Sequence, residues 1–387
     1  IGGTSLHSSG FDDVFIAKFD PNGSVIWATS AGSPLKEDCD INFHTSMVCS
    51  ESSLPNWGSN SKLDGNKMAV DGDGNTWLTG TFCASNSASY NTDIGSCYAT
   101  FGNLSIGVDV NWGYGLSFVA KIDSDGNWLW VQKATANHAF NDPDESYDGI
   151  RAHAIAVDPE GGAFITGMAS THTSSCTYGG QLYFGDLSVS GRDKKTFLAK
   201  ISDNGSWEFA ITEDENGCSN TVDNLGVDVA VAPSGDVVLL GEFRGATSQG
   251  GTHAQVFDFD GTIVYYPVSN PPADNNPQIY VAAFNETGSL KGSEAAIFYG
   301  NWSAPYSGST PNEGTIAGSV SVDSSGDIYV VGSYDGVGCI AWNWNDDNCV
   351  YDLVQSDGRD AFVAKLSAEW SFANLFQGVP WLRNVSS

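Results

Sequence analysis

Two short stretches decide the fold: MAVDGDGNTWLTG at residues 68–80 and FVAKIDSDGNWLWV at residues 118–131. In each, apolar, β-branched or aromatic residues flank a turn of the form D-x-x-G. Asp at the first turn position accepts hydrogen bonds from the turn backbone, and Gly at the fourth position supplies the positive φ that closes a hairpin. Both stretches are therefore predicted to be β-hairpins with minimal turns.

The two hairpins recur in alternation along the chain, and the copies align without gaps. Copies of the first type lie at 155–167, 229–241 and 320–332, and copies of the second type lie at 15–28, 197–210, 280–293 and 362–375. In the last copy Trp370 occupies the place of the turn glycine, so a different turn is predicted there. Self-similarity of this kind is typical of a repeat architecture.

One hairpin of each type supplies four strands, here called a, b, c and d, and four strands make one blade of a β-propeller. Residues 1–30 supply part of strand b and strands c and d of a further blade. We expect a single all-β domain over 1–387, a propeller of five four-stranded blades whose ring closes when the tail at 377–387 adds a strand to the blade at 1–30. The alternative is a fragment of a longer propeller array. Full blades are predicted at about 66–134, 153–212, 227–298 and 318–376.

The repeat units FVAK-D-x-x-G-x-W-x-W-A and AVD-x-x-G-x-x-Y-V-x-G resemble the SBBP beta-propeller repeat of exported bacterial and archaeal proteins. The linking pieces TFGNLSI (100–106) and YFGDLSV (183–189) resemble the F-G-x-L element of the same family. The resemblance extends over nearly the whole chain. It implies a propeller fold and export, and no catalytic motif is attached to it.

The connections between hairpins are long and mutually dissimilar, whereas the turns within hairpins are all minimal. In an antiparallel blade the a–b and c–d turns share one face, and the b–c and d–a connections share the other. All the variable sequence is therefore predicted on one face, and loops on a rigid scaffold are where binding usually resides.

All eight cysteines lie in these connections. An even number of cysteines in short loops predicts disulfides and an oxidising, extracellular or cell-surface location. Metal binding is the less favoured alternative, because no C-x-x-C or Cys/His cluster with ligand spacing occurs. The predicted pairs are Cys39–Cys49, Cys83–Cys97, Cys339–Cys349 and Cys176–Cys218.

The chain carries 46 acidic against 16 basic side chains, a formal charge of −30. Such a field repels nucleic acid and anionic lipid. No apolar run is long enough to span a bilayer, so membrane insertion is not expected. The expected partners are extracellular glycans, proteins or copies of the chain itself.

Aromatic side chains are frequent in the connections, and exposed Trp and Tyr stack on sugar rings or anchor protein partners. The alternative, favoured for more than half of them, is that they form small cores beneath the long loops. The ligand-binding candidates are Trp112, Tyr114, Trp302, Tyr306, Trp342 and Trp344. Sequons mark Asn103, Asn301 and Asn384 as glycosylation candidates, although several sequons are expected by chance.

No cofactor is required, and calcium is the one ion considered. The loop 141–149 groups four hard oxygen ligands, although a solvated acidic loop is the favoured interpretation. The turns at 71–75 and 123–127 resemble the start of a calcium loop but lack its distal Glu, so hairpin chemistry explains them. The four candidate ligands are Asp142, Asp144, Glu145 and Asp148.

Strand c carries a lysine in every copy except the one with Ala283, and strand a ends in aspartate except at Ala232 of the same repeat. This joint loss predicts a structural Asp–Lys contact within each blade. The lysines are Lys18, Lys121, Lys200 and Lys365, and the aspartates are Asp71, Asp158 and Asp323.

No catalytic motif occurs, so catalysis is not expected. The function expected first is that of a binding or adhesion module, and a structural subunit of an extracellular filament or surface layer is the alternative. A glycoside hydrolase-like enzyme is the second alternative, because five-bladed rings can place two carboxylates near their axis.

Overall fold

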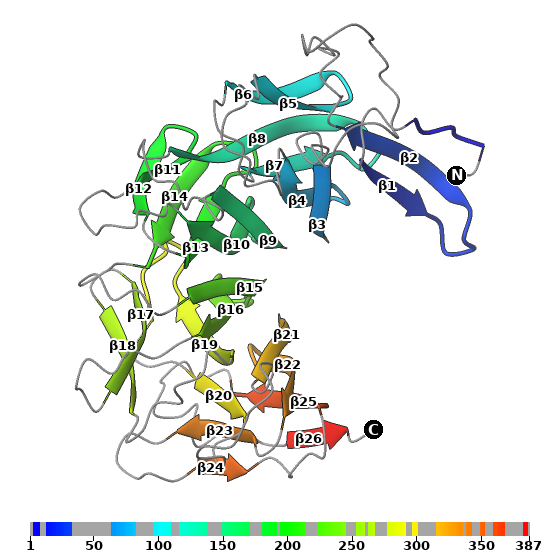
Figure 1. The fold of residues 1–387 in the computed structure, drawn as a ribbon. Coiled ribbons are helices and arrows are strands. Elements are labelled where there is room, and N and C mark those ends of the chain that lie inside the picture. Colours follow the sequence, from blue (N-terminus) through cyan, green and yellow to red (C-terminus); the bar gives the residue numbers. More distant parts are fainter. Residues whose placement is uncertain are drawn as a thin grey trace, which may run out of the picture.

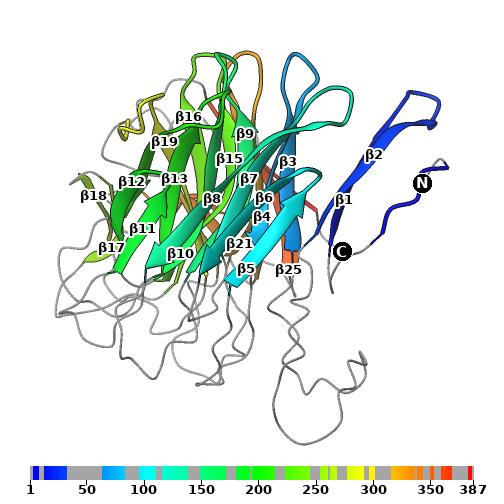
Figure 2. The ribbon, with the colours of Figure 1, turned by 90° about the horizontal axis from the view of Figure 1, so that it is seen from above.

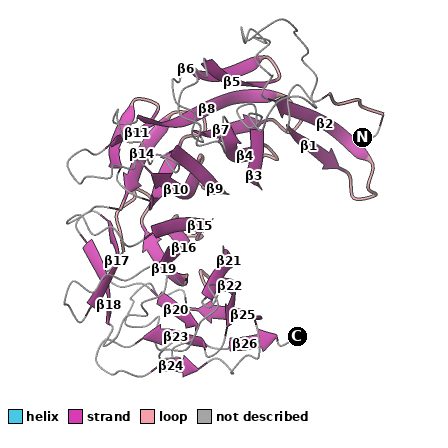
Figure 3. Ribbon diagram, viewed as in Figure 1, coloured by secondary structure: helices cyan, strands magenta, loops and turns pink. Residues whose placement is uncertain are grey.

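A computed structural model describes part of the chain in detail. The described residues are 3–7, 13–32, 63–82, 96–109, 116–137, 149–170, 180–191, 194–213, 223–244, 253–259, 262–267, 277–291, 296–300, 315–335, 338–342, 349–352, 359–367 and 382–385. Within them the secondary structure consists of β-strands, and all strand pairs are antiparallel (Figure 3). The predicted all-β class is confirmed.

The predicted order a-b-c-d is confirmed in the second, third and fourth sheets. The second sheet contains β3 (Leu63–Val70), β4 (Thr76–Phe82), β7 (Leu116–Ile122) and β8 (Trp128–Asn137). The third contains β9 (Gly149–Val157), β10 (Ala163–Ser170), β13 (Lys194–Ile201) and β14 (Trp207–Thr212). The fourth contains β15 (Asp223–Val231), β16 (Val237–Arg244), β19 (Gln278–Phe284) and β20 (Ala296–Gly300). The fifth contains β21 (Thr315–Val322), β22 (Ile328–Asp335) and β25 (Arg359–Leu366) in the order a-b-c, and its fourth strand is β26 (Leu382–Val385) from the tail. The residues predicted to form strand d of this sheet, 368–376, lie outside the described residues.

The first sheet begins at strand c, with β1 (Val14–Phe19) and β2 (Val25–Gly32). Among the described residues no strand pairs with the free edge of β1, and residues 3–7 form no strand. The predicted strands c and d of the first sheet are therefore confirmed, whereas residues 3–7 do not form the predicted part of strand b.

The sheets follow one another around an open arc, with the a strands β3, β9, β15 and β21 nearest its centre (Figure 1). The hairpin turns lie together on one face of the arc (Figure 2). This common face confirms the predicted placement of the minimal turns.

The described strands do not form a closed ring. The tail strand β26 pairs with β25, and Ala361 lies opposite Val385. The N- and C-termini lie at opposite ends of the arc (Figure 1). The prediction that 377–387 adds a strand to the first sheet is therefore wrong. The outer edge of β25 lies close by in sequence, and an unpaired edge favours the nearest strand that can satisfy its backbone groups.

The F-G-x-L pieces, expected as links, form hairpins that join the preceding sheet. The hairpin of β5 (Ser96–Phe101) and β6 (Leu104–Asp109) pairs with β2, and that of β11 (Gly180–Phe184) and β12 (Leu187–Gly191) pairs with β8. The hairpin of β23 (Gly338–Trp342) and β24 (Cys349–Asp352) pairs with β20. A fourth hairpin, β17 (His253–Phe259) with β18 (Thr262–Pro267), forms a separate two-stranded sheet.

The added hairpins correct the prediction of four strands per blade, because the second and fourth sheets each have six. The physical reason is the outer edge of strand d, which stays unpaired unless another strand covers it. Gly102 and Gly185, both at φ 58°, make the tight turns that these hairpins need.

The hydrophobic core lies in layers between consecutive sheets. We call the face that a sheet turns to its predecessor the upstream face, and the opposite face the downstream face. Ile16 of the first sheet packs in one layer with Phe118 and Ile122, on the upstream face of the second. Trp77 and Val119, on the downstream face of the second sheet, share a layer with the third sheet.

A glycine of strand b lies opposite the aromatic residue of strand c in every complete sheet. Gly241 faces Tyr280 so closely that a Cβ would lie 2.2 Å from Tyr280 Cζ. At this position the aromatic ring therefore occupies the space of a side chain, which explains the glycine at Gly241. The remaining pairs are Gly80 with Phe118, Gly167 with Phe197, and Gly332 with Phe362.

Candidate functional site

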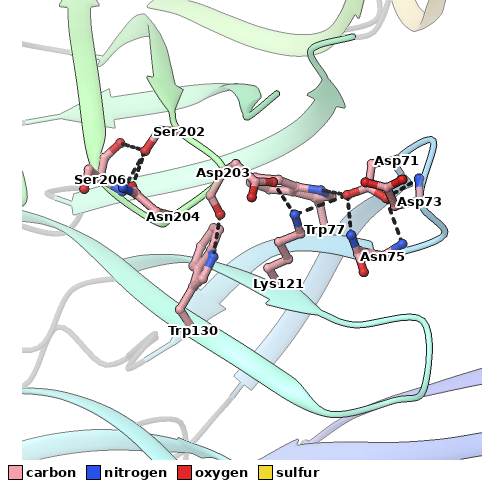
Figure 4. A network of polar contacts seen from close by, with 10 residues as sticks. All are labelled: Asp71, Asp73, Asn75, Trp77, Lys121, Trp130, Ser202, Asp203, Asn204 and Ser206. Carbon is pink, nitrogen blue, oxygen red and sulfur yellow. Dashed lines mark hydrogen bonds and ion pairs between the residues drawn. The ribbon is translucent and has the colours of Figure 1, made fainter. Parts of the chain in front are cut away.

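The predicted Asp–Lys contacts within sheets are confirmed. Lys121 Nζ lies 3.2 Å from Asp71 Oδ2 (Figure 4). Lys200 Nζ lies 2.8 Å from Asp158 Oδ2. Lys365 Nζ lies 3.9 Å from Asp323 Oδ2 and is also paired with Asp327, at 2.6 Å. These lysines therefore have a structural role.

The carboxylate of Asp71 is fully engaged by its own hairpin. Oδ1 accepts hydrogen bonds from the backbone N–H of Asp73 and of Asn75, and Oδ2 accepts from Asn75 Nδ2 and Trp77 Nε1 (Figure 4). Burial acts to raise the pKa of Asp71, but the hydrogen bonds from Asn75 and Trp77, together with Lys121, lower it to about 2. Hairpin chemistry therefore accounts for this calcium-like turn.

Lys121 also joins its sheet to the next one, because its Nζ pairs with Asp203 in the c–d turn of the third sheet (Figure 4). Trp130 Nε1 donates to the backbone oxygen of Asp203 at 2.9 Å. The first sheet repeats the arrangement, since Lys18 Nζ and Trp27 Nε1 both donate to the backbone oxygen of Ser124, at 3.1 and 2.9 Å. A lysine and a tryptophan thus connect each of these sheets to the following turn.

The same tryptophans pack on the glycine of the following turn. A Cβ at Gly126 would lie 2.8 Å from Trp27 Cδ2, and a Cβ at Gly205 would lie 3.0 Å from Trp130 Cδ2. A Cβ at Gly288 would lie 2.7 Å from the ring of Phe209. Glycine is therefore required in these turns for two reasons. The turn needs a positive φ, and an aromatic ring of the preceding sheet occupies the space that a side chain would fill.

Trp128 and Trp207 pack on the added hairpins instead. A Cβ at Gly102 or at Gly185 would lie 2.9 Å from Cδ1 of Trp128 or Trp207, respectively. Each ring also meets a phenylalanine edge to face, Phe101 in one case and Phe184 in the other. The repeat tryptophans are therefore packing residues.

A second polar group lies on the inner side of the arc, where the a strands run. Each a strand contains a bulge residue three positions before the strand-ending A-V-D or related motif. The residue directly after the bulge is Lys67 in the second sheet, Asp228 in the fourth and Ser319 in the fifth. Asp228 pairs with Lys67 and accepts hydrogen bonds from Ser319 Oγ and the backbone N–H of Val320.

The bulge residue of the third sheet is His153, whose Nδ1 lies 2.9 Å from the backbone oxygen of Gly226 in the fourth sheet. Burial lowers the pKa of His153, and the hydrogen bond to Gly226 opposes that shift. A neutral imidazole therefore donates to Gly226. Sequence reasoning missed this inner cluster, whose only signal is one repeat position occupied by Lys67, Asp228 and Ser319.

A third polar group is buried between the third and fourth sheets. Asn224 Nδ2 donates to Glu213 Oε2, and the hydroxyls of Thr196 and Tyr280 lie 2.7 Å apart. Burial raises the pKa of Glu213 to about 7, against the opposing effects of Lys195 and Asn224. Burial also raises the pKa of Tyr280, and the nearby Glu213 adds to that shift. This group too joins two neighbouring sheets.

Most of the binding candidates lie outside the described residues. That holds for five cysteines, the acidic loop and most of the aromatic candidates, and their proposed roles stay predictions. The residues concerned are Cys39, Cys49, Cys83, Cys176, Cys218, Asp142, Asp144, Glu145, Asp148, Trp112, Tyr114, Trp302, Tyr306, Trp344 and Asn301.

The other candidates fall on the added hairpins or on the tail strand. Cys97 lies on β5 opposite Val108, and Cys339 and Cys349 lie on the paired strands β23 and β24. Trp342 lies opposite Cys349. Asn103 is exposed in the β5–β6 turn, and Asn384 lies on β26 opposite Phe362. Their predicted disulfides, ligand contacts and glycans stay predictions.

The described ranges hold no group of three or more His, Cys, Asp or Glu side chains arranged to bind a metal ion. They also include no helix of the length and apolarity that a bilayer crossing demands.

No protein-family model matches the chain, and no curated protein matches it. The resemblance to the SBBP repeat therefore stays a hypothesis, based on the hairpin motifs alone.

Proposed function

We propose that this chain is an exported scaffold of the β-propeller type, which binds an extracellular glycan or protein through the face that bears its long connections. The single observation that carries the proposal is that the hairpin turns and the strand ends leading into the long connections lie on opposite faces. The minimal hairpin turns share one face (Figure 2), so the strand ends that lead into the connections point to the other.

The scaffold is stiff enough to present such a face. Each pair of consecutive sheets shares an apolar layer, and ion pairs and indole hydrogen bonds reinforce the junctions. Loops held by a rigid framework lose little conformational entropy when they bind, which favours affinity.

Sugar recognition is supported by the aromatic content of the connections. Trp342 belongs to β23, on the outermost hairpin of the fourth sheet, and Trp344 follows it in the sequence. Indole rings stack on sugar rings, and a protein of charge −30 favours neutral or cationic ligands over anionic ones.

A glycan array tests this proposal directly. The purified chain is expected to bind a subset of neutral glycans, and the Trp342→Ala and Trp344→Ala variants are expected to lose at least ~10-fold in affinity. Asn22→Ala, at an exposed position on the turn face, is the matched control and should bind as the parent does. Absence of binding to every glycan and to extracellular protein extracts would contradict the proposal.

A second candidate function is that of a structural subunit in an extracellular filament or layer. The open arc favours it, since its first and fifth sheets stand at free ends (Figure 1). Electron microscopy of purified material should then show assemblies, whereas discrete single particles at all concentrations would contradict this function.

A further inference from the structure

The first sheet exposes two aromatic side chains at repeat positions that are buried in every other copy. Phe15 is 62% exposed, whereas its counterparts Phe118, Phe197, Tyr280 and Phe362 are at most 1% exposed. Phe19 is 55% exposed, whereas Ile122, Ile201, Phe284 and Leu366 are at most 1% exposed. The repeat therefore provides an apolar upstream face here that nothing in the described residues covers.

A third exposed apolar residue of this sheet, Ile26, does not belong to the uncovered face. Ile26 is 57% exposed, but its counterpart Leu129 is also 47% exposed, and the third sheet carries Glu208 at this position. Ile26 therefore marks a repeat position that faces solvent in any sheet. The uncovered patch consists of Phe15 and Phe19.

At the opposite end of the arc, the described residues leave the other face of a sheet uncovered. Val331 of the fifth sheet is 42% exposed, whereas Leu240, Thr166 and Thr79 at the same position are fully buried. Val331 lies between Ser319 and Val363 in the sheet, and Ile316, which is 39% exposed, shares its face. This is the downstream face, which in the second, third and fourth sheets packs against the following sheet.

The turn of the first sheet shows the same vacancy. A Cβ at Gly23 would meet nothing within 4 Å, whereas the counterparts Gly126, Gly205 and Gly288 each have an aromatic ring of the preceding sheet at 2.7 to 3.0 Å. Gly23 nevertheless has the same turn geometry, with φ 81°. The first sheet is therefore shaped to receive a preceding sheet.

We propose that the missing neighbour is a second copy of this chain. The downstream face of the fifth sheet in one copy packs on the upstream face of the first sheet in the next, around Phe15, Phe19 and Val331. The interface continues the packing that already joins the five sheets, with the same repeat positions in contact. Two different faces meet, so the contact is heterologous and extends into open chains or larger rings. The proposal deepens the second candidate function above and leaves glycan binding independent of it.

Sedimentation velocity over about 1 to 100 µM tests the proposal. The parent chain is expected to form oligomers that lengthen with concentration. Phe15→Glu and Val331→Glu each place a charge in the apolar contact and should weaken association at least ~10-fold. Ile26→Glu, which introduces the residue that the third sheet carries naturally, is the matched control and should associate as the parent does.

Mixing the two variants identifies the mode of contact. Phe15→Glu keeps a functional fifth-sheet face and Val331→Glu keeps a functional first-sheet face, so an equimolar mixture should form heterodimers and stop there. Circular dichroism and thermal unfolding of each variant check that the fold is retained, which the exposure of both side chains favours.

Four results would overturn the proposal. A parent chain that stays monomeric at all concentrations would show that the two faces do not join copies. A mixture that stays monomeric, or an effect of only one variant, would show that these two faces are not partners. Association equally weakened by Ile26→Glu would show unspecific adhesion. If the parent chain does not assemble but still binds glycans, this proposal fails while the proposed binding function stands.

Discussion

Lys67 in the second sheet and Asp228 in the fourth form an ion pair on the inner side of the arc, although the third sheet lies between them. Asp228 is almost fully buried and also accepts hydrogen bonds from Ser319 and Val320 of the fifth sheet. One carboxylate therefore connects three sheets.

Removal of this carboxylate should destabilise the fold strongly. Asp228→Ala leaves Lys67, the Ser319 hydroxyl and the Val320 N–H without their acceptor, so the free energy of unfolding should fall by about 3 kcal/mol. Lys291→Met is the control, because Asp236, at 2.6 Å from Lys291 Nζ, is more exposed than Asp228, and loss of this pair should cost less than about 1 kcal/mol. Equal losses in urea unfolding would contradict the bridging role of Asp228.

The packing of an aromatic ring on a turn glycine can be isolated with two equivalent turns. Gly126→Ala strains a φ of 93° and also places a Cβ 2.8 Å from Trp27 Cδ2, whereas Gly23→Ala strains a φ of 81° and meets nothing within 4 Å. The backbone cost of about 1 kcal/mol is common to both, and Gly126→Ala should cost about 1 to 2 kcal/mol more. Similar melting temperatures for the two variants would argue against the contact.

Lys121 should matter more for stability than an exposed lysine does. Lys121→Met leaves Asp71 and Asp203 without their shared cation, so the melting temperature should fall, with a loss of about 2 kcal/mol. The pKa of Asp71 should rise toward its usual range at the same time, as NMR titration would show. An unchanged melting temperature would refute the structural role of the strand-c lysines.

The buried Glu213 makes stability depend on pH in a defined window. Its pKa is raised to about 7, so the folded state binds a proton that the unfolded state has released above pH 4.5. The free energy of unfolding should therefore fall as the pH rises from about 4.5 to about 7, by on the order of 3 kcal/mol in total. Glu213→Gln should remove this slope, and a parent chain whose stability is flat across the window would contradict the assignment.

Local features of this fold could be predicted because a few residues at fixed positions of the repeat determine each of them. The D-x-x-G turns specify their own hairpins, as the hydrogen bonds to Asp71 show. The Asp–Lys contacts could be predicted from the joint replacement by Ala232 and Ala283. The repeat tryptophans could be assigned to packing because they recur at fixed positions.

Features that depend on where whole sheets lie could not be predicted in the same way. The piece around Phe101 looks like a link in its own repeat, yet it pairs with β2 of the preceding sheet. The inner cluster has a different residue type in each sheet, so alignment of the repeats marks only one variable polar position and does not show that Lys67, Asp228 and Ser319 meet. The pairing of β26 with β25 depends on which free edge is nearest in space.

The central claim is that consecutive repeats stack as sheets, each connected to the turn of the next. Zero-length carbodiimide cross-linking followed by mass spectrometry tests it most directly, because Lys121 Nζ pairs with Asp203, whose side chain is exposed. The account predicts a cross-link between Lys121 and Asp203 that is lost in Asp203→Asn. Cross-links from Lys121 to carboxylates outside the second and third sheets, with none to Asp203, would contradict it.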